Sequence, residues 1–161
     1  KGLEQMISQA YPLAKQQRCL IHISRNLASK VKRADRAVIL KQFKTIYRTE
    51  NLEIAVLALE DFIAEWKPKY RKVMESLENT DNLLTFYQFP YQIWHSIYST
   101  NLIESLNKEI KYQTKKKVLF PNEEALERYL VTLFEDYNFK QSQRIHKGFG
   151  QCSDTLESLF D

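Results

Sequence analysis

The chain has 161 residues, of which 43% are hydrophobic and 12% aromatic, and this composition excludes an intrinsically disordered polypeptide. Lysine and arginine number 24 against 20 aspartates and glutamates, so the net charge of +4 permits nucleic-acid binding without requiring it. Two cysteines exclude a disulfide framework and no apolar run is long enough to span a bilayer, so we expect an intracellular protein without a membrane partner.

The first part of the chain predicts two helices and one short strand. With only 3 glycines and 4 prolines, a mostly helical fold is expected. Pro12 ends the first helix. The apolar run Cys19–Ile23 is too short for a helix of its own, so it is interpreted as a buried strand, although it could also begin the next helix. Because the sequence starts without methionine and inside a helical pattern, we expect a piece of a longer protein.

Three further helices are predicted in the middle of the chain. Asp35 is expected to cap the first and Asn51 the second, and Pro68 suits the first turn of the third. The second, residues 52–66, is apolar nearly all round until Asp61, which predicts a central helix in a cluster.

An aromatic-rich segment follows, predicted as a short helix and then an extended connection. Its aromatic side chains, from Phe86 to Trp94, could stack on unpaired bases. They could instead pack this segment against the rest of the protein, and we favour that interpretation because large aromatics mostly bury area.

The helix that starts near Asn101 carries the most informative pattern. Asn101 and Glu104 have the spacing of a capping box, the ordinary interpretation. A different one follows from the helical face shared by Glu104, Lys108, Lys111 and Lys115. Such lysines can lie against successive phosphates, although a solvated face is the usual role of a lysine run. A carboxylate at their head can hold a divalent metal. Asn122 is expected to cap the following helix.

Three sequence motifs carry a resemblance to a known family. The segments "FYQFPYQIWHSIYSTNLIESLNKEIK" and "FPNEEA" resemble the C-terminal part of Mutator-type transposases, in particular their bacterial insertion-sequence relatives. The segment "YPLAKQQRCLIHISRN" resembles an earlier signature of the same family, in the expected order. The resemblance implies cleavage and transfer of DNA strands at insertion-sequence ends by a ribonuclease-H-like core. In such a DDE core, two aspartates and one glutamate hold divalent metals, Mg²⁺ or Mn²⁺.

The family's glutamate matches Glu104, and the resemblance therefore favours a catalytic, metal-binding role for this residue over a capping role. The implied fold is mainly α, the C-terminal fragment of the catalytic core with one short strand and an all-helical insertion. Residues 1–31 would end the first part of the core, residues 32–91 would form the insertion, and residues 92–161 would return to the core. Neither catalytic aspartate matches an aspartate of this chain, so we expect this fragment alone to bind no metal tightly and to transfer no strand.

The implied partner is double-stranded DNA, at transposon ends and target, in the bacterial cytoplasm, with a homodimer as the assembly of the intact protein. The expected DNA-contacting residues are Lys108, Lys111, Lys115, Lys116, Lys117, Asn101, Arg25, Asn26 and His22. The alternative is a non-catalytic helical module that binds nucleic acid or a protein partner.

Cys19 and His22 raise a separate possibility, a zinc site completed by His146 and Cys152. We disfavour it because the second pair has the wrong spacing for common zinc modules. On a strand, Cys19 and His22 would face opposite sides, which predicts Cys19 in the core and His22 near the site.

Overall fold

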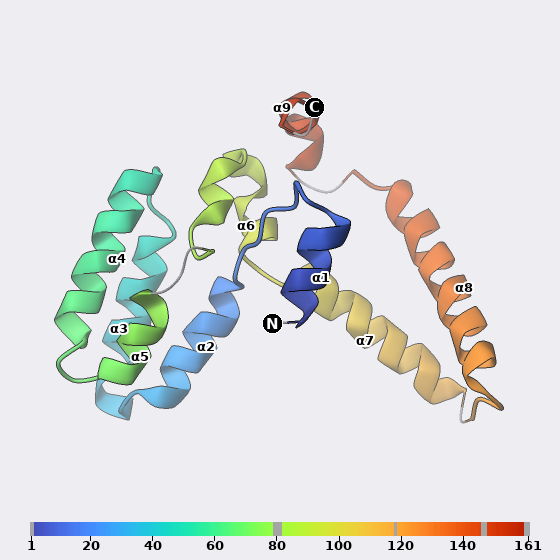
Figure 1. Ribbon diagram of the computed structural model, residues 1–161, viewed down its shortest axis with the longest axis horizontal. Helices are drawn as coiled ribbons and strands as arrows, with labels where there is room; N and C mark the ends of the chain where they lie inside the picture. Colours follow the sequence, from blue (N-terminus) through green and yellow to red (C-terminus); the bar gives the residue numbers. More distant parts are fainter. Residues whose placement is uncertain (1, 79–81, 118, 146–147, 160–161) are drawn as a thin grey trace.

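The computed structural model describes residues 2–78, 82–117, 119–145 and 148–159, and the side chains from residue 5 onward (Figure 1). The described elements are α1 (Gly2–Ala10), α2 (Leu20–Lys30), α3 (Arg33–Ile46), α4 (Leu52–Trp66), α5 (Arg71–Glu78), the 3₁₀ helices η1 (Thr85–Gln88) and η2 (Tyr91–Ile93), α6 (Trp94–Ile97), α7 (Asn101–Lys116), α8 (Glu123–Ser142), the 3₁₀ helix η3 (Phe149–Gln151) and α9 (Ser153–Ser158). The expectation of a mainly α fold is thus confirmed, and these ranges contain no strand. Within them, no helix has the length and apolarity that a membrane span requires.

The hydrophobic core lies between α2, α3, α4 and α5, which pack in chain order on one side of the molecule (Figure 1). Phe43 of α3 is fully buried and contacts the ring of Phe62 from α4, with centroids 6.0 Å apart. Leu20 of α2 and Met74 of α5 are also fully buried in this core. Burial of this kind stabilises each large side chain by about 1.5–3 kcal/mol.

The strand interpretation of Cys19–Ile23 is wrong and the alternative, a helix start, is confirmed, because α2 begins at Leu20 with Cys19 as its N-cap. Leu20 and Leu27 are buried, Ile23 is partly buried between them, and Val31 follows the helix on the same side. This spacing of three to four residues is helical, and it becomes visible only when the run is read together with the polar residues after it. On a helix, Cys19 and His22 lie on one side and not on opposite sides.

Helix α4 lies at the edge of the molecule and not at its centre, so its predicted central position is also wrong (Figure 1). Ala55, Phe62 and Ile63 are its buried residues. On its outer face, Ile54 is 51% and Leu57 62% exposed. Apolarity around the whole helix therefore does not mark burial on every side here.

The predicted N-caps agree with the structure at two positions. Asn51 and Asn122 are the N-caps of α4 and α8. The side-chain Oδ1 atom of each accepts a hydrogen bond from the backbone amide three residues further along the chain. Asp35 is not a cap, because α3 begins after Lys32, and its carboxylate binds Lys69 Nζ at 2.7 Å. Pro68 lies in the turn before α5 and not in its first turn.

The aromatic segment packs onto the core through short helical turns, where an extended connection was expected. Phe86 of η1 is fully buried, and its ring lies 5.3 Å from Trp94 and 5.2 Å from Tyr98. The Trp94 indole Nε1 donates to the Phe89 carbonyl at 2.7 Å. The favoured packing role is therefore confirmed for Phe86 and Trp94, whereas Tyr91 stays 75% exposed.

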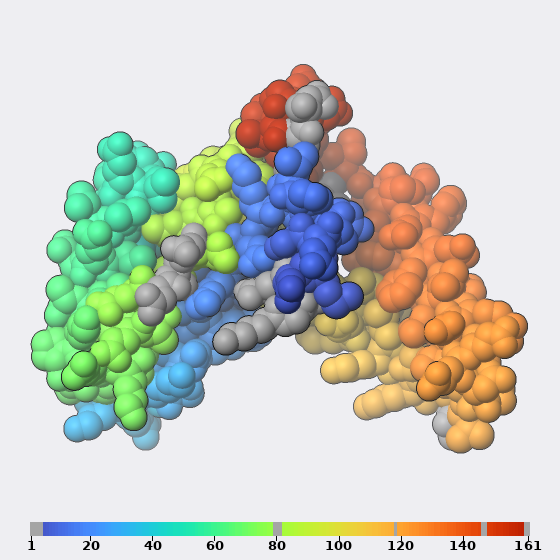
Figure 2. Space-filling view, viewed as in Figure 1, coloured from blue at the N-terminus to red at the C-terminus, as the bar shows by residue number. Residues whose placement is uncertain are grey.

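Helices α7 and α8 lie on the opposite side of the molecule from α4. In Figure 2, α8 (orange) projects away from the helices of the core. Neither helix has a buried residue. They contact each other where the Tyr129 hydroxyl donates to the Gln113 carbonyl at 3.2 Å.

Candidate functional site

The first turn of α7 meets the first turn of α2. The Leu20 amide donates to the Tyr98 carbonyl at 2.9 Å, which holds the two chain segments together. Thr100 is the N-cap of α7, and its carbonyl accepts from the Glu104 amide at 2.9 Å. The helix thus begins one residue earlier than the capping box required, so the predicted cap at Asn101 is wrong. Asn101 is exposed and is the first residue of α7.

The carboxylate of Glu104 lies between α7 and α2. Its Oε1 atom is 3.3 Å from His22 Nε2, 3.7 Å from an Arg25 guanidinium nitrogen, and accepts from the Thr100 hydroxyl at 3.1 Å. The described residues give its second oxygen, Oε2, no partner. The side chains of Glu104, His22 and Arg25 are 36%, 53% and 62% exposed, so the group is open to a ligand from solvent.

Thr100 connects this carboxylate to a thiol. Its Oγ1 atom lies 3.3 Å from Cys19 Sγ and 3.3 Å from His22 Nδ1. Burial raises the pKa of the Cys19 thiol, but hydrogen bonds with Thr100 and His22 outweigh it, so the pKa is lower than usual. Cys19 is half-buried beside the site, and its predicted place in the core is wrong because helix α2 turns it toward Thr100.

Glu104 fits a metal site only in part. A hard divalent cation takes several oxygen ligands, and the described residues contain no group of three or more His, Cys, Asp or Glu side chains that could hold a metal. The Arg25 guanidinium beside Oε1 adds a positive charge next to the carboxylate. For zinc, His146 lies outside the described residues, and the buried Cys152 thiol donates to the Gly148 carbonyl at 3.2 Å.

The lysines of α7 divide into two groups. Lys108, Lys111 and Lys115 are exposed and form no ion pair with any described acid. Lys116 lies over the Tyr112 ring at 4.1 Å, and Lys117 over the Tyr129 ring of α8 at 4.6 Å. The first group is therefore free to contact an anion, whereas Lys117 is directed toward α8.

The structure thus brings together three of the predicted site residues, Glu104, His22 and Arg25, and leaves Asn26 exposed further along α2. Sequence reasoning missed Thr100, which contacts Glu104, His22 and Cys19. The four-residue spacing between Thr100 and Glu104, which puts both on one helical face, was the available signal.

Comparison with known proteins places the chain in a family. Residues 1–142 match the family described as "Transposase, Mutator family". The chain is 95% identical over all its 161 residues to the transposase for insertion sequence element IS905 of Lactococcus lactis subsp. lactis (strain IL1403), and it spans 41% of that protein's length. It is 42% identical over 130 residues, 80% of the chain and 35% of the relative, to the transposase for insertion sequence element IS1201 of Lactobacillus helveticus. The chain belongs to the Mutator family of insertion-sequence transposases.

Proposed function

We propose that the chain forms part of the catalytic region of a DDE-type transposase that cleaves and transfers DNA strands at insertion-sequence ends, with Glu104 as one of its metal-binding carboxylates. The observation that carries this proposal is the contact of Glu104 with His22 and Arg25, which joins two family motifs in one solvent-accessible group. Residues 78 apart in sequence, His22 and Thr100, meet at this point.

The residues of this chain have distinct tasks in the proposal. His22, Arg25 and Thr100 bind Oε1 of Glu104 and fix the direction of its free Oε2. Lys108, Lys111 and Lys115 follow on the same helical face, where they bind phosphates of the DNA backbone. Mg²⁺ or Mn²⁺ held by such carboxylates supplies Lewis-acid chemistry at a phosphodiester.

Two further carboxylates are needed, and the described residues bring none to Glu104. They would come from other parts of the ribonuclease-H-like core in the intact protein, which we propose acts as a homodimer on double-stranded DNA in the bacterial cytoplasm. The 161-residue chain alone therefore binds Mg²⁺ weakly and does not cut DNA.

The test is a nicking assay on labelled insertion-sequence-end DNA with the full-length protein. Glu104→Gln keeps the size of the side chain and removes its charge, so cleavage should fall by more than about a hundredfold, the upper end for losing an outer-shell partner of a metal site. Glu109→Gln, an exposed glutamate on the same helix, is the matched control and should cleave normally. Full activity in Glu104→Gln contradicts the catalytic role. Cleavage by the 161-residue chain alone contradicts the need for further carboxylates.

The second candidate function is a non-catalytic nucleic-acid-binding module, favoured by the three exposed lysines without acidic partners on α7. It predicts duplex binding that weakens steeply with salt and that Lys108→Gln reduces, together with normal cleavage by Glu104→Gln.

A further inference from the structure

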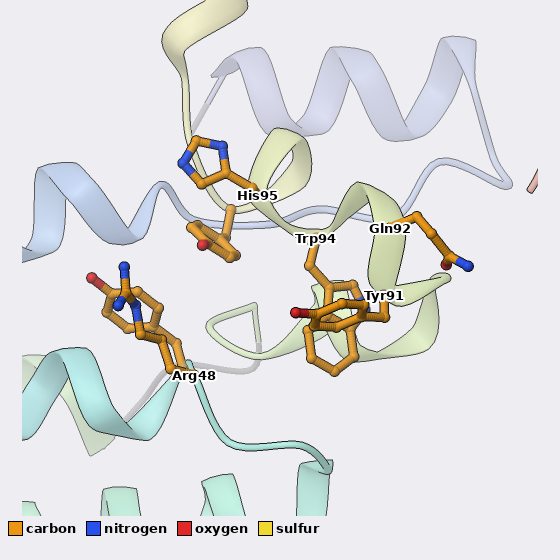
Figure 3. A pocket seen from close by; sticks show the side chains of 7 residues that line it. Arg48, Tyr91, Gln92, Trp94 and His95 are labelled. Carbon is orange, nitrogen blue, oxygen red and sulfur yellow. The ribbon is translucent and has the colours of Figure 1, made fainter. Parts of the chain in front are cut away.

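A second candidate site lies away from Glu104, between the end of α3 and the aromatic segment. It is a cavity of about 420 Å³, within the range of about 300–1,000 Å³ that small ligands occupy. The lining residues that matter here are Tyr47, Arg48, Tyr91, Trp94, His95 and Tyr98. Figure 3 shows Arg48 across the cavity from Tyr91 and Trp94, with His95 above them.

The ring of Tyr91 forms a stacking surface that Trp94 holds in place. The Tyr91 ring lies edge to face with Trp94, with centroids 5.1 Å apart and planes at 73°. Trp94 is fixed by its indole hydrogen bond to the Phe89 carbonyl. Tyr91 is 75% exposed, although large aromatics usually bury their area, so its ring face remains available to a planar ligand.

The cavity is also positively charged. Arg48 forms no ion pair with a described acid, and among the described residues no aspartate or glutamate lines the cavity. A neighbouring cavity of about 280 Å³ shares Tyr47, Arg48, His95 and Tyr98 with it and adds Lys44, one helical turn before Arg48. We call these two adjoining cavities the groove; Arg48 and Lys44 line it, and no carboxylate of the described residues does.

Two tyrosine hydroxyls in the lining have no hydrogen-bond partner among the residues that the structure describes. Tyr47 and Tyr98 are only 6% and 9% exposed, and within the described part of the chain neither hydroxyl has a hydrogen bond. Buried polar groups are usually hydrogen-bonded, so these hydroxyls are suited to bind a polar ligand. Burial raises the pKa of Tyr98, which keeps its hydroxyl protonated as a donor.

We propose that this groove binds an unpaired nucleotide of a DNA strand. The base stacks on the exposed Tyr91 ring, and Arg48 and Lys44 bind the adjacent phosphates. An acidic peptide would match the charge but would not use the stacking surface. The proposal rests on the proposed function only in taking DNA as the partner.

The experiment uses the 161-residue chain and a short single-stranded oligonucleotide that carries one 2-aminopurine. Stacking should quench the fluorescence of 2-aminopurine when the strand binds. Tyr91→Ala and Arg48→Ala should each weaken binding by about tenfold, as expected for the loss of one stacked base or one phosphate contact. Both side chains are exposed, so the variants should fold, which circular dichroism checks. Phe139→Ala, which removes a 69% exposed aromatic from α8, should change nothing.

Three results would overturn the proposal: absence of quenching, equal binding by Tyr91→Ala, or equal binding of a strand with an abasic nucleotide in place of 2-aminopurine. The outcome is independent of the nicking assay. Quenching together with normal cleavage by Glu104→Gln would keep this site and reject the catalytic role. If cleavage depends on Glu104 but the oligonucleotide shows no quenching, the catalytic role is kept and this site is rejected.

Discussion

At the scale of single residues, Asp35 links the start of α3 to the turn before α5. Its carboxylate binds Lys69 Nζ at 2.7 Å and the Tyr70 hydroxyl, which also accepts from the Lys32 amide at 3.1 Å. The hydrogen bond from Lys69, followed by that from Tyr70, lowers the pKa of Asp35 below that of an unfolded chain. The ionised form is thus favoured by folding.

This coupling predicts a pH-dependent stability. Because the folded pKa of Asp35 is lowered, its stabilisation is complete above the unfolded pKa and is lost as the pH falls through the folded pKa. Asp35→Asn should therefore unfold at lower urea than the wild type near neutral pH, and the difference should shrink in the acid range. Asp61→Asn, at an exposed aspartate without a described ion pair, is the control. A deficit that stays constant with pH would contradict the ionic origin.

Some contacts of single residues could be predicted from the sequence, and others could not. The family resemblance gave Glu104 a catalytic role, and Arg25 was expected to contact DNA. The contact of Arg25 with Glu104 was not predicted. The role of Arg48 and His95 in a second cavity was not predicted. They are far apart in sequence and meet only after α3 and α6 have packed, so no local spacing marks them.

At the scale of elements, a cap holds the start of α4 in place. Asn51 Oδ1 accepts from the Ile54 amide at 2.9 Å. Asn51→Ala should lower the free energy of unfolding by about 1 kcal/mol, measured by urea titration, whereas Asn51→Ser should retain most of it. Asn101→Ala, at the residue that is exposed in the first turn of α7 and is not its cap, should stay within about 0.5 kcal/mol. Equal losses at Asn51 and Asn101 would contradict this assignment of caps.

Elements were predictable where their signals are local. The caps at Asn51 and Asn122 depend on adjacent residues and were predicted correctly. The start of α2 was only the less favoured interpretation, because its apolar run is the same length as a strand and only Leu27 and Val31 beyond it reveal the helical period. The outer position of α4 depends on which neighbouring helices cover it, and the composition of α4 alone does not reveal this.

At the scale of the whole molecule, the core is concentrated in α2–α5 and the aromatic segment, and α7 and α8 have no buried residue. Local stability follows buried apolar contact. In hydrogen exchange at neutral pH, the amides of α3 should therefore exchange slowest and those of α8 much faster. If the amides of α8 are protected from exchange as strongly as those of α3, then α8 is stabilised by something other than its few contacts, and the prediction is wrong.

The Glu104 site also sits where a long segment of chain returns to its starting point. The Leu20 amide meets the Tyr98 carbonyl, and the helices α3, α4 and α5 between them contribute no residue to the site. Doubling the length of a flexible loop costs only about 0.6 kcal/mol in loop-closure entropy. Insertions in the turns between the helices of this segment should therefore cost little, while Glu104 keeps its contacts with His22, Arg25 and Thr100.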